Sequence, residues 1–171
     1  MEIEYCLDTS VYTQAHRSYY AFDLAPGFWV ALRQLAQQKV LISPISVFTE
    51  LAKGNDELAV WAKANKVFLF VDPDDKVIEA FRQIADFSNS RYDDQHWVRE
   101  FLGGADPWVI AHAKAHNLTV VTMEGGKGSE DLDPKSKRIR GKLKIPNMCA
   151  HFGVKCISTF ELVRTLKIGL G

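Results

Sequence analysis

The sequence predicts an α/β protein with a parallel sheet that is covered by helices on both faces. Short apolar runs rich in β-branched residues, such as Leu118-Thr-Val-Val-Thr122, alternate along the chain with longer segments of helical periodicity. Uninterrupted apolar runs of this length are typical of parallel strands, because such strands are buried on both faces. The 171 residues suffice for one domain with its own core, so we expect a single domain over residues 1–171.

The N-terminal half begins with two well-marked strands. Ile3-Glu-Tyr-Cys-Leu7 predicts the first and Val40-Leu-Ile42 the second. Ser43-Pro44 then starts a helix over 44–53 that stops before Gly54, because proline fits the first helical turn and glycine favours the C-terminal end. The other elements expected here are a short helix from Ser10, helices at about 27–38 and 56–64, a strand at 67–71, and a helix from Asp72-Pro73 to about residue 87.

The C-terminal half is marked by the segment 104–124. Asp106 is suited to cap a helix over 106–116, Pro107 fits its first position, and Asn117 is suited to end it. A buried strand at 118–122 follows, and Glu124 comes just past its end. The other elements expected here are a helical piece at 95–102, a long loop at about 125–145, a short helix at 146–152, a strand at 154–157 and a helix at 159–168.

Composition and charge exclude several classes of protein. Lys and Arg number 21, as do Asp and Glu, so no overall positive charge indicates a nucleic-acid partner. The apolar runs are too short to span a membrane, and the acidic N-terminus does not resemble a signal peptide, so we expect a cytoplasmic protein. Three cysteines without a Cys-x-x-Cys pair predict neither a disulfide framework nor a zinc site.

Four acidic residues follow, or lie one or two helical turns beyond, the segments that form strands. They are Asp8, Glu50, Asp106 and Glu124. In parallel sheets, ligands bind outside the carboxyl ends of the strands, which favours one shared site. Converging carboxylates repel one another and need a cation between them, and a hard divalent ion such as Mg²⁺ or Mn²⁺ prefers oxygen ligands. Taken singly, each acid has an ordinary explanation, such as helix capping by Asp8 or Asp106.

Polar and basic residues near these acids are candidates for substrate binding. The hydroxyl groups of Thr9, Ser10 and Thr122 lie at the ends of the expected strands. Residues 135–144 hold six basic residues and no acid, which is typical either of a solvated loop or of a segment that contacts phosphates. The candidate phosphate contacts in this block are Lys137, Arg138 and Arg140.

The chain resembles the PIN-domain proteins, the nuclease family that includes the VapC-type toxins of bacterial toxin–antitoxin pairs. The resemblance lies in Leu7-Asp8-Thr9-Ser10, Glu50 in a helix after the second strand, Ala105-Asp106 opening a helix, and Val120-Val-Thr122 followed by an acid. It covers nearly the whole chain, and it is closest to a PIN-like group of uncharacterised bacterial proteins. It implies a three-layer α/β/α sandwich around a central parallel sheet.

The resemblance also implies an activity. Asp8, Glu50 and Asp106 match metal-binding, catalytic acids of the family, and Glu124 matches the fourth, where the family more often has Asp. It implies a ribonuclease dependent on Mg²⁺ or Mn²⁺, an RNA substrate and an antitoxin protein as partner, and it allows a homodimer. The glutamate at 124 lengthens the side chain by one methylene, which favours an alternative: a PIN-like module of weak or no activity that binds RNA or a protein partner.

Two other enzyme chemistries fit the sequence poorly. A phosphatase of the HAD type needs a second Asp two residues after the first, and Ser10 occupies that position. His112 and His116 have the i, i+4 spacing of a metal pair, but no Glu follows His112 as in zinc proteases, so we expect packed or exposed histidines.

Overall fold

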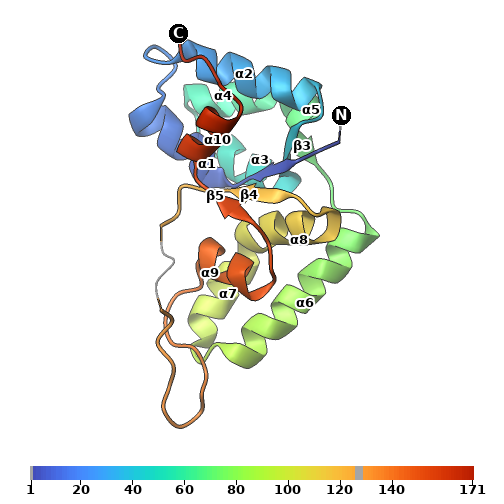
Figure 1. Ribbon diagram of the computed structural model, residues 1–171, viewed down its shortest axis with the longest axis vertical. Coiled ribbons are helices and arrows are strands. Elements are labelled where there is room, and N and C mark those ends of the chain that lie inside the picture. The colour runs from blue at the N-terminus through green and yellow to red at the C-terminus, as the bar shows by residue number, and fades with distance from the viewer. Residues whose placement is uncertain (1, 126–128) are drawn as a thin grey trace.

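The computed structural model describes residues 2–125 and 129–171, and it shows a five-stranded parallel sheet between two layers of helices (Figure 1). This confirms the predicted α/β fold. The strands lie in the order β3-β2-β1-β4-β5. Their bounds are β1 Tyr5–Leu7, β2 Leu41–Pro44, β3 Phe70–Val71, β4 Thr119–Val121 and β5 Cys156–Ile157.

The strand order places a switch point in the middle of the sheet. The chain builds outward from β1 through β2 to β3, and then returns to the other side of β1 for β4 and β5. Cys6 pairs with Ile42 on one side of β1, and Leu7 pairs with Val121 on the other. Ligands of open parallel sheets bind where neighbouring strands lead away in opposite directions. The carboxyl ends of β1 and β4 are therefore where a site is expected.

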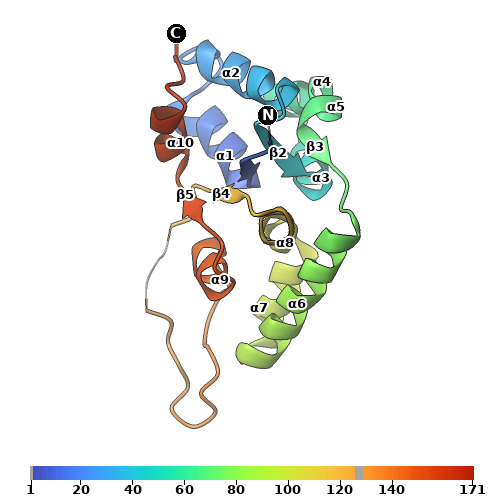
Figure 2. The ribbon, with the colours of Figure 1, turned by 45° about the vertical axis from the view of Figure 1, so that its right-hand side comes forward.

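Helices cover both faces of the sheet, as Figures 1 and 2 show. One layer contains α1 Thr9–Gln14 with its π-helical continuation Ala15–Tyr19, α2 Pro26–Gln37, α3 Ile45–Ala52, α4 Glu57–Ala64, α5 Lys66–Leu69 and α10 Thr159–Thr165. The other contains α6 Asp75–Arg91, α7 Gln95–Gly103, α8 Asp106–His116 and α9 Ile145–His151. Across residues 2–125 and 129–171, no helix combines the length and apolarity needed to cross a membrane.

The expected strand at 67–71 is largely wrong. Residues 66–69 form the helical turn α5, and only Phe70 and Val71 pair with β2. Helical geometry buries Leu69 completely while Val67 stays 89% exposed, so the apolar run does not lie flat in the sheet. The following helix also begins later than expected, because Asp74 caps it by accepting a hydrogen bond from the Val77 amide at 2.9 Å.

Between β4 and α9 the chain makes a long excursion that hangs below the helical layer in Figures 1 and 2. We call residues 129–144 the arm. Ile139 is 1% exposed, and its backbone exchanges hydrogen bonds with Arg91 (2.7 Å) and Asp93 (2.9 Å). The Arg138 guanidinium donates to the carbonyls of Asn89 (2.8 Å) and Tyr92 (2.5 Å). The arm is therefore anchored on the C-terminal end of α6.

Candidate active site

Asp8 lies directly after β1, at the switch point of the sheet. Its backbone amide donates to the Val121 carbonyl at 3.0 Å, which aligns it with the end of β4. Its Oδ2 accepts hydrogen bonds from Ser10 Oγ (2.6 Å) and Thr122 Oγ1 (2.9 Å), and the Ser10 amide makes it the N-cap of α1. Its Oδ1 is buried and has no hydrogen-bond partner among the described residues. Burial raises the pKa of the Asp8 carboxyl, and the hydrogen bonds lower it in part.

The hydroxyl groups of Ser10 and Thr122 orient this carboxylate and the chain that leaves β4. Ser10 Oγ accepts a hydrogen bond from the Met123 amide at 2.9 Å, and Thr122 Oγ1 accepts one from the Glu124 amide at 3.0 Å. Each hydroxyl therefore donates to Asp8 while accepting from the segment after β4. The structure gives both residues a positioning role at the end of the sheet.

Glu50 connects three helices near the same edge. It projects from α3, and its Oε2 accepts a hydrogen bond from Thr9 Oγ1 at 2.6 Å. Its Oε1 accepts one from the Ala105 amide at 3.0 Å, just before α8 begins. Glu50 therefore holds the start of α1 and the start of α8 against α3.

Asp106 is the first residue of α8, and Ala105, not Asp106, occupies the cap position. The expectation that Asp106 caps the helix is therefore wrong. A capping residue directly precedes the helix, whereas Asp106 already lies within the first helical turn. Burial, together with the charges of Asp8, Glu124 and Glu50, raises the pKa of Asp106 to about 8, although Lys142 lowers it in part. The four predicted acids thus influence one another electrostatically.

Glu124 follows β4 by three residues and contacts the next helix. Its Oε2 accepts a hydrogen bond from the Ile145 amide, the first residue of α9, at 2.9 Å. Burial raises the pKa of Glu124, the Asp8 charge adds to this, and the Ile145 amide and nearby lysines lower it.

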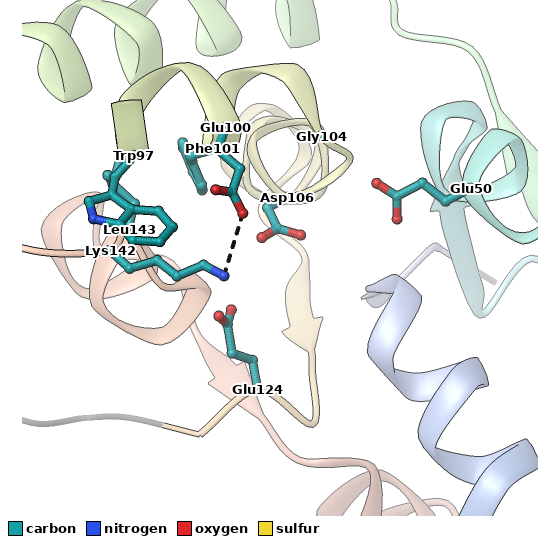
Figure 3. Close-up of a pocket in the computed structure, with 9 residues that line it drawn as sticks. All are labelled: Glu50, Trp97, Glu100, Phe101, Gly104, Asp106, Glu124, Lys142 and Leu143. Atoms are coloured by element: carbon teal, nitrogen blue, oxygen red, sulfur yellow. Dashed lines mark ion pairs between the residues drawn. The ribbon is translucent and has the colours of Figure 1, made fainter. Parts of the chain in front are cut away.

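Two adjoining pockets contain the four acids. Glu50, Asp106 and Glu124 line one of them, which we call the acidic pocket (Figure 3). Asp8 lines the other with Thr9 and Ser10, and Asp106 and Glu124 belong to both. Figure 3 shows Asp106 between Glu50 on one side and Glu124 on the other. The remaining lining residues of the acidic pocket are Trp97, Glu100, Phe101, Gly104, Lys142 and Leu143.

Sequence reasoning did not find four charged or aromatic residues of the acidic pocket, namely Trp97, Glu100, Phe101 and Lys142. Trp97 and Glu100 carry no signal in the sequence, because α7 is recognisable only as an ordinary amphipathic helix. Lys142 belongs to the basic block, but nothing in a run of six basic residues indicates which of them reaches the acids. Its Nζ lies 3.6 Å from Glu100 Oε1.

The donor chemistry of the site suits a hard divalent cation. The acids offer only oxygen atoms, and the buried Oδ1 of Asp8 lacks the partner that a cation would supply. Within the described parts of the chain, no three His, Cys, Asp or Glu side chains are already placed to hold a metal ion. Glu50 and Glu124 are instead each held by a hydrogen bond from a backbone amide, that of Ala105 and that of Ile145.

The three basic residues predicted to contact phosphate do not line the acidic pocket. Arg138 is bonded to backbone carbonyls of the α6 end. Arg140 pairs with Asp133 at 2.7 Å and with Asp131 at 3.8 Å. Lys137 is exposed in a turn with a φ of 60°.

The two histidines of α8 do not form a pair. His112 is buried at 2% exposure, whereas His116 contacts Asp74 Oδ2 at 2.8 Å.

Comparisons with known proteins place the chain in a family. No curated protein matches its sequence. A solved chain in the "Crystal structure of VapBC2 from Rickettsia felis bound to a DNA fragment from their promoter" is 17% identical, with a TM-score of 0.43 over 84% of this chain and 100% of that chain. Residues 5–170 match the family described as "Domain of unknown function (DUF4411)", and the chain belongs to this family.

Proposed function

We propose that this chain is a divalent-metal-dependent ribonuclease that hydrolyses RNA phosphodiester bonds. The observation that carries the proposal is the convergence of four carboxylates from separate segments on the switch point of the sheet, with a buried oxygen of Asp8 left without a partner. The sequence resemblance to PIN-domain nucleases supports the same conclusion.

Asp8, Asp106 and Glu124 are the residues that would hold Mg²⁺ or Mn²⁺, since all three line the same pocket. When bound, the cation would lower the pKa of a water molecule and neutralise charge on a phosphoryl oxygen. Ser10 and Thr122 fix the orientation of the Asp8 carboxylate through their hydroxyl groups. With a pKa of about 8, Asp106 carries a proton at neutral pH, which it would release to solvent in order to hold a cation.

In this proposal, the main role of Glu50 is to hold neighbouring helices in place. Both of its carboxylate oxygens accept hydrogen bonds, one from Thr9 and one from the Ala105 amide. It therefore keeps α8, and with it Asp106, at a fixed place relative to α1. Glu50 also raises the pKa of Asp106 through its charge, which favours a cation in the acidic pocket.

We further propose that the ribonuclease is the toxin of a toxin–antitoxin pair, as the resemblance implies. An antitoxin that blocks the activity would place an Arg or Lys side chain against the carboxylates, since a cation relieves their repulsion. Co-purification of a small basic-tailed protein with the chain, and its release by Asp106→Asn, would support this partner.

A non-cutting binding module is the second candidate, and one observation favours it. Glu50 and Glu124 each accept a hydrogen bond from a backbone amide, which reduces their freedom to approach a shared ion. In that case the acidic pocket would recognise a basic group of a partner, and the chain would bind without hydrolysis.

The deciding experiment is cleavage of a pool of single-stranded and structured RNA in Mn²⁺, Mg²⁺ or EDTA. We expect cleavage with either metal and none in EDTA, and its loss in Asp8→Asn and Asp106→Asn. Asp86→Asn, an exposed aspartate in α6, is the matched control and should cleave normally. Folding is checked by circular dichroism, and metal binding by the rise in Tm on adding Mn²⁺.

Three outcomes separate the candidates. Cleavage that persists in EDTA or in both site variants would contradict the metal-dependent mechanism. No cleavage in any metal, with a folded protein, would favour the binding module. A Mn²⁺-dependent rise in Tm that Asp106→Asn abolishes would locate the cation even if the RNA pool lacks the right substrate.

A further inference from the structure

The end of the arm presents two lysines beside the acidic pocket. Ile139, Leu143 and Ile145 are buried, with exposed fractions of 1%, 2% and 0%. Lys142 and Lys144 alternate with the last two of these residues and are exposed. In extended chain, successive side chains point to opposite sides, so the buried residues fix the lysines on the outer side. The lysines are therefore held in place by packing of their neighbours.

Lys142 belongs to two adjoining pockets. It lines the acidic pocket with Glu100 and Glu124, as Figure 3 shows. It also lines a second pocket with Arg140 and Lys144, which we call the basic groove. Lys142 thus stands where the two pockets meet.

The acids of the basic groove are already engaged. Glu130 contacts Tyr92 OH at 2.8 Å and His151 Nε2 at 2.7 Å. Asp131 lies 3.8 Å from Arg140, whose other nitrogen contacts Asp133. Arg140 is therefore largely neutralised, which leaves the two lysines as the positive charges that the groove offers to a ligand.

The present partner of Lys142 holds it weakly. The Lys142–Glu100 pair is 3.6 Å long, and its side chains are 54% and 50% exposed. Exposed pairs of this kind contribute little to stability, and a phosphate offers the ammonium group the same kind of charge-assisted bond as the carboxylate does. The Trp97 ring, 5.5 Å from Lys142 Nζ, supports the ammonium group at the mouth of the pocket. Lys142 can therefore exchange Glu100 for a phosphate at little cost.

We propose that Lys142 and Lys144 bind the backbone phosphates of an RNA strand where it passes from the acidic pocket into the basic groove. The inference rests on the proposed ribonuclease function and adds the path of the substrate to it. A polyanion that approaches several carboxylates needs positive charge next to them. The two lysines supply this charge beside Glu124: Lys142 lines the acidic pocket with it, and Lys144 directly precedes Ile145, whose amide donates to the Glu124 carboxylate at 2.9 Å.

The test compares RNA binding by charge-matched variants of the arm. Fluorescence anisotropy of a labelled single-stranded RNA is recorded in EDTA over a range of salt concentrations, for wild type, Lys142→Ala, Lys144→Ala and the double variant. Lys135→Ala removes the same charge from an exposed turn of the arm and is the control. We expect affinity to fall about 3- to 10-fold for each lysine, and the salt slope to fall by ~0.7 for each phosphate that the variant no longer neutralises. Lys142→Arg should retain binding, and Lys135→Ala should match wild type.

The outcomes distinguish this inference from the proposed function. Wild-type affinity and salt slope in Lys142→Ala and the double variant, with metal-dependent cleavage intact, would overturn the inference alone. Tighter RNA binding by Lys142→Ala would also overturn it, because the lysine would then block the pocket. If the wild-type protein neither binds nor cleaves RNA but binds polyglutamate through these lysines, the groove serves an acidic protein, and the proposed function fails too.

Discussion

Replacing Asp106 by asparagine should stabilise the protein in EDTA, although it should abolish the proposed activity. Burial and the charges of Asp8, Glu124 and Glu50 raise the pKa of this carboxyl from 3.8 to about 8. The folded protein therefore keeps the proton at neutral pH, whereas the unfolded chain releases it. Asparagine has nearly the same shape and no charge, so it removes this cost of folding.

The size of this gain in stability follows from the difference between the pH of the experiment and the pKa of the carboxyl in the unfolded chain. At pH 7 this difference is about 3 units, and each unit corresponds to about 1.4 kcal/mol of stability, which gives at most ~4 kcal/mol. Asp106 is partly exposed and water screens some of the repulsion, so we expect a gain of about 2–4 kcal/mol in the free energy of unfolding. Because the folded pKa is raised, the wild-type protein loses stability as pH rises from about 4 to 8.

Urea denaturation followed by circular dichroism at pH 5, 6, 7 and 8 measures this difference. The gain in Asp106→Asn should be small at pH 5 and grow toward pH 8, whereas Asp86→Asn should differ little from wild type at any pH. A variant that is less stable than wild type at pH 7, or a gain that does not change with pH, would refute the reasoning.

Three further predictions concern the rest of the fold. Burial lowers the pKa of His112 from 6.5 to about 4, so the unfolded chain takes up the proton first, and stability should fall by up to ~3 kcal/mol between pH 6.5 and 4; urea titrations should show a weaker decline for His112→Leu. Ser43→Ala should cost about 1–3 kcal/mol in thermal melts, because it leaves the buried Tyr12 hydroxyl, now 2.7 Å from Ser43 Oγ, without this partner; adding Tyr12→Phe should recover part of the loss. Ser158→Ala should lower stability by about 1 kcal/mol in urea, since it removes the capping box with Glu161 at the start of α10, whereas Ser158→Thr should not.

Local signals in the sequence predicted most elements of the fold. Proline and glycine delimited α3, the β-branched run at 118–122 contained β4, and Asn117 ends α8 in a left-handed conformation with a φ of 55°. Such signals act within a few residues. They failed at α5, because a short apolar run is compatible with a strand as well as with a helix. The packing that buries Leu69 in the core is not visible in the local sequence.

Contacts between segments that are far apart in the chain could not be predicted from the sequence. The alternation of strands and helices implied a parallel sheet, but not that β4 lies next to β1, which brings Thr122 to Asp8. The basic block suggested phosphate contacts without ranking its members. The contacts that anchor the arm determine which basic residue reaches the acidic pocket. Arg138 bonds to the end of α6, whereas Lys142 lines the pocket together with the buried Leu143.

The hydrogen bond from the Ile145 amide to Glu124 has a consequence for how this protein could be remodelled. At 2.9 Å, it joins the point where the chain leaves the sheet region to the point where it re-enters the helical layer. An insertion whose two ends meet can change in length at small entropic cost, since closure depends only on the logarithm of loop length. Within this excursion the same holds for the exposed turn 134–137, whose ends are joined by the hydrogen bond from the Asp133 amide to the Arg138 carbonyl at 2.8 Å. Sequences of other length and charge could be grafted into that turn, whereas Ile139 and Leu143 have to stay because they are buried.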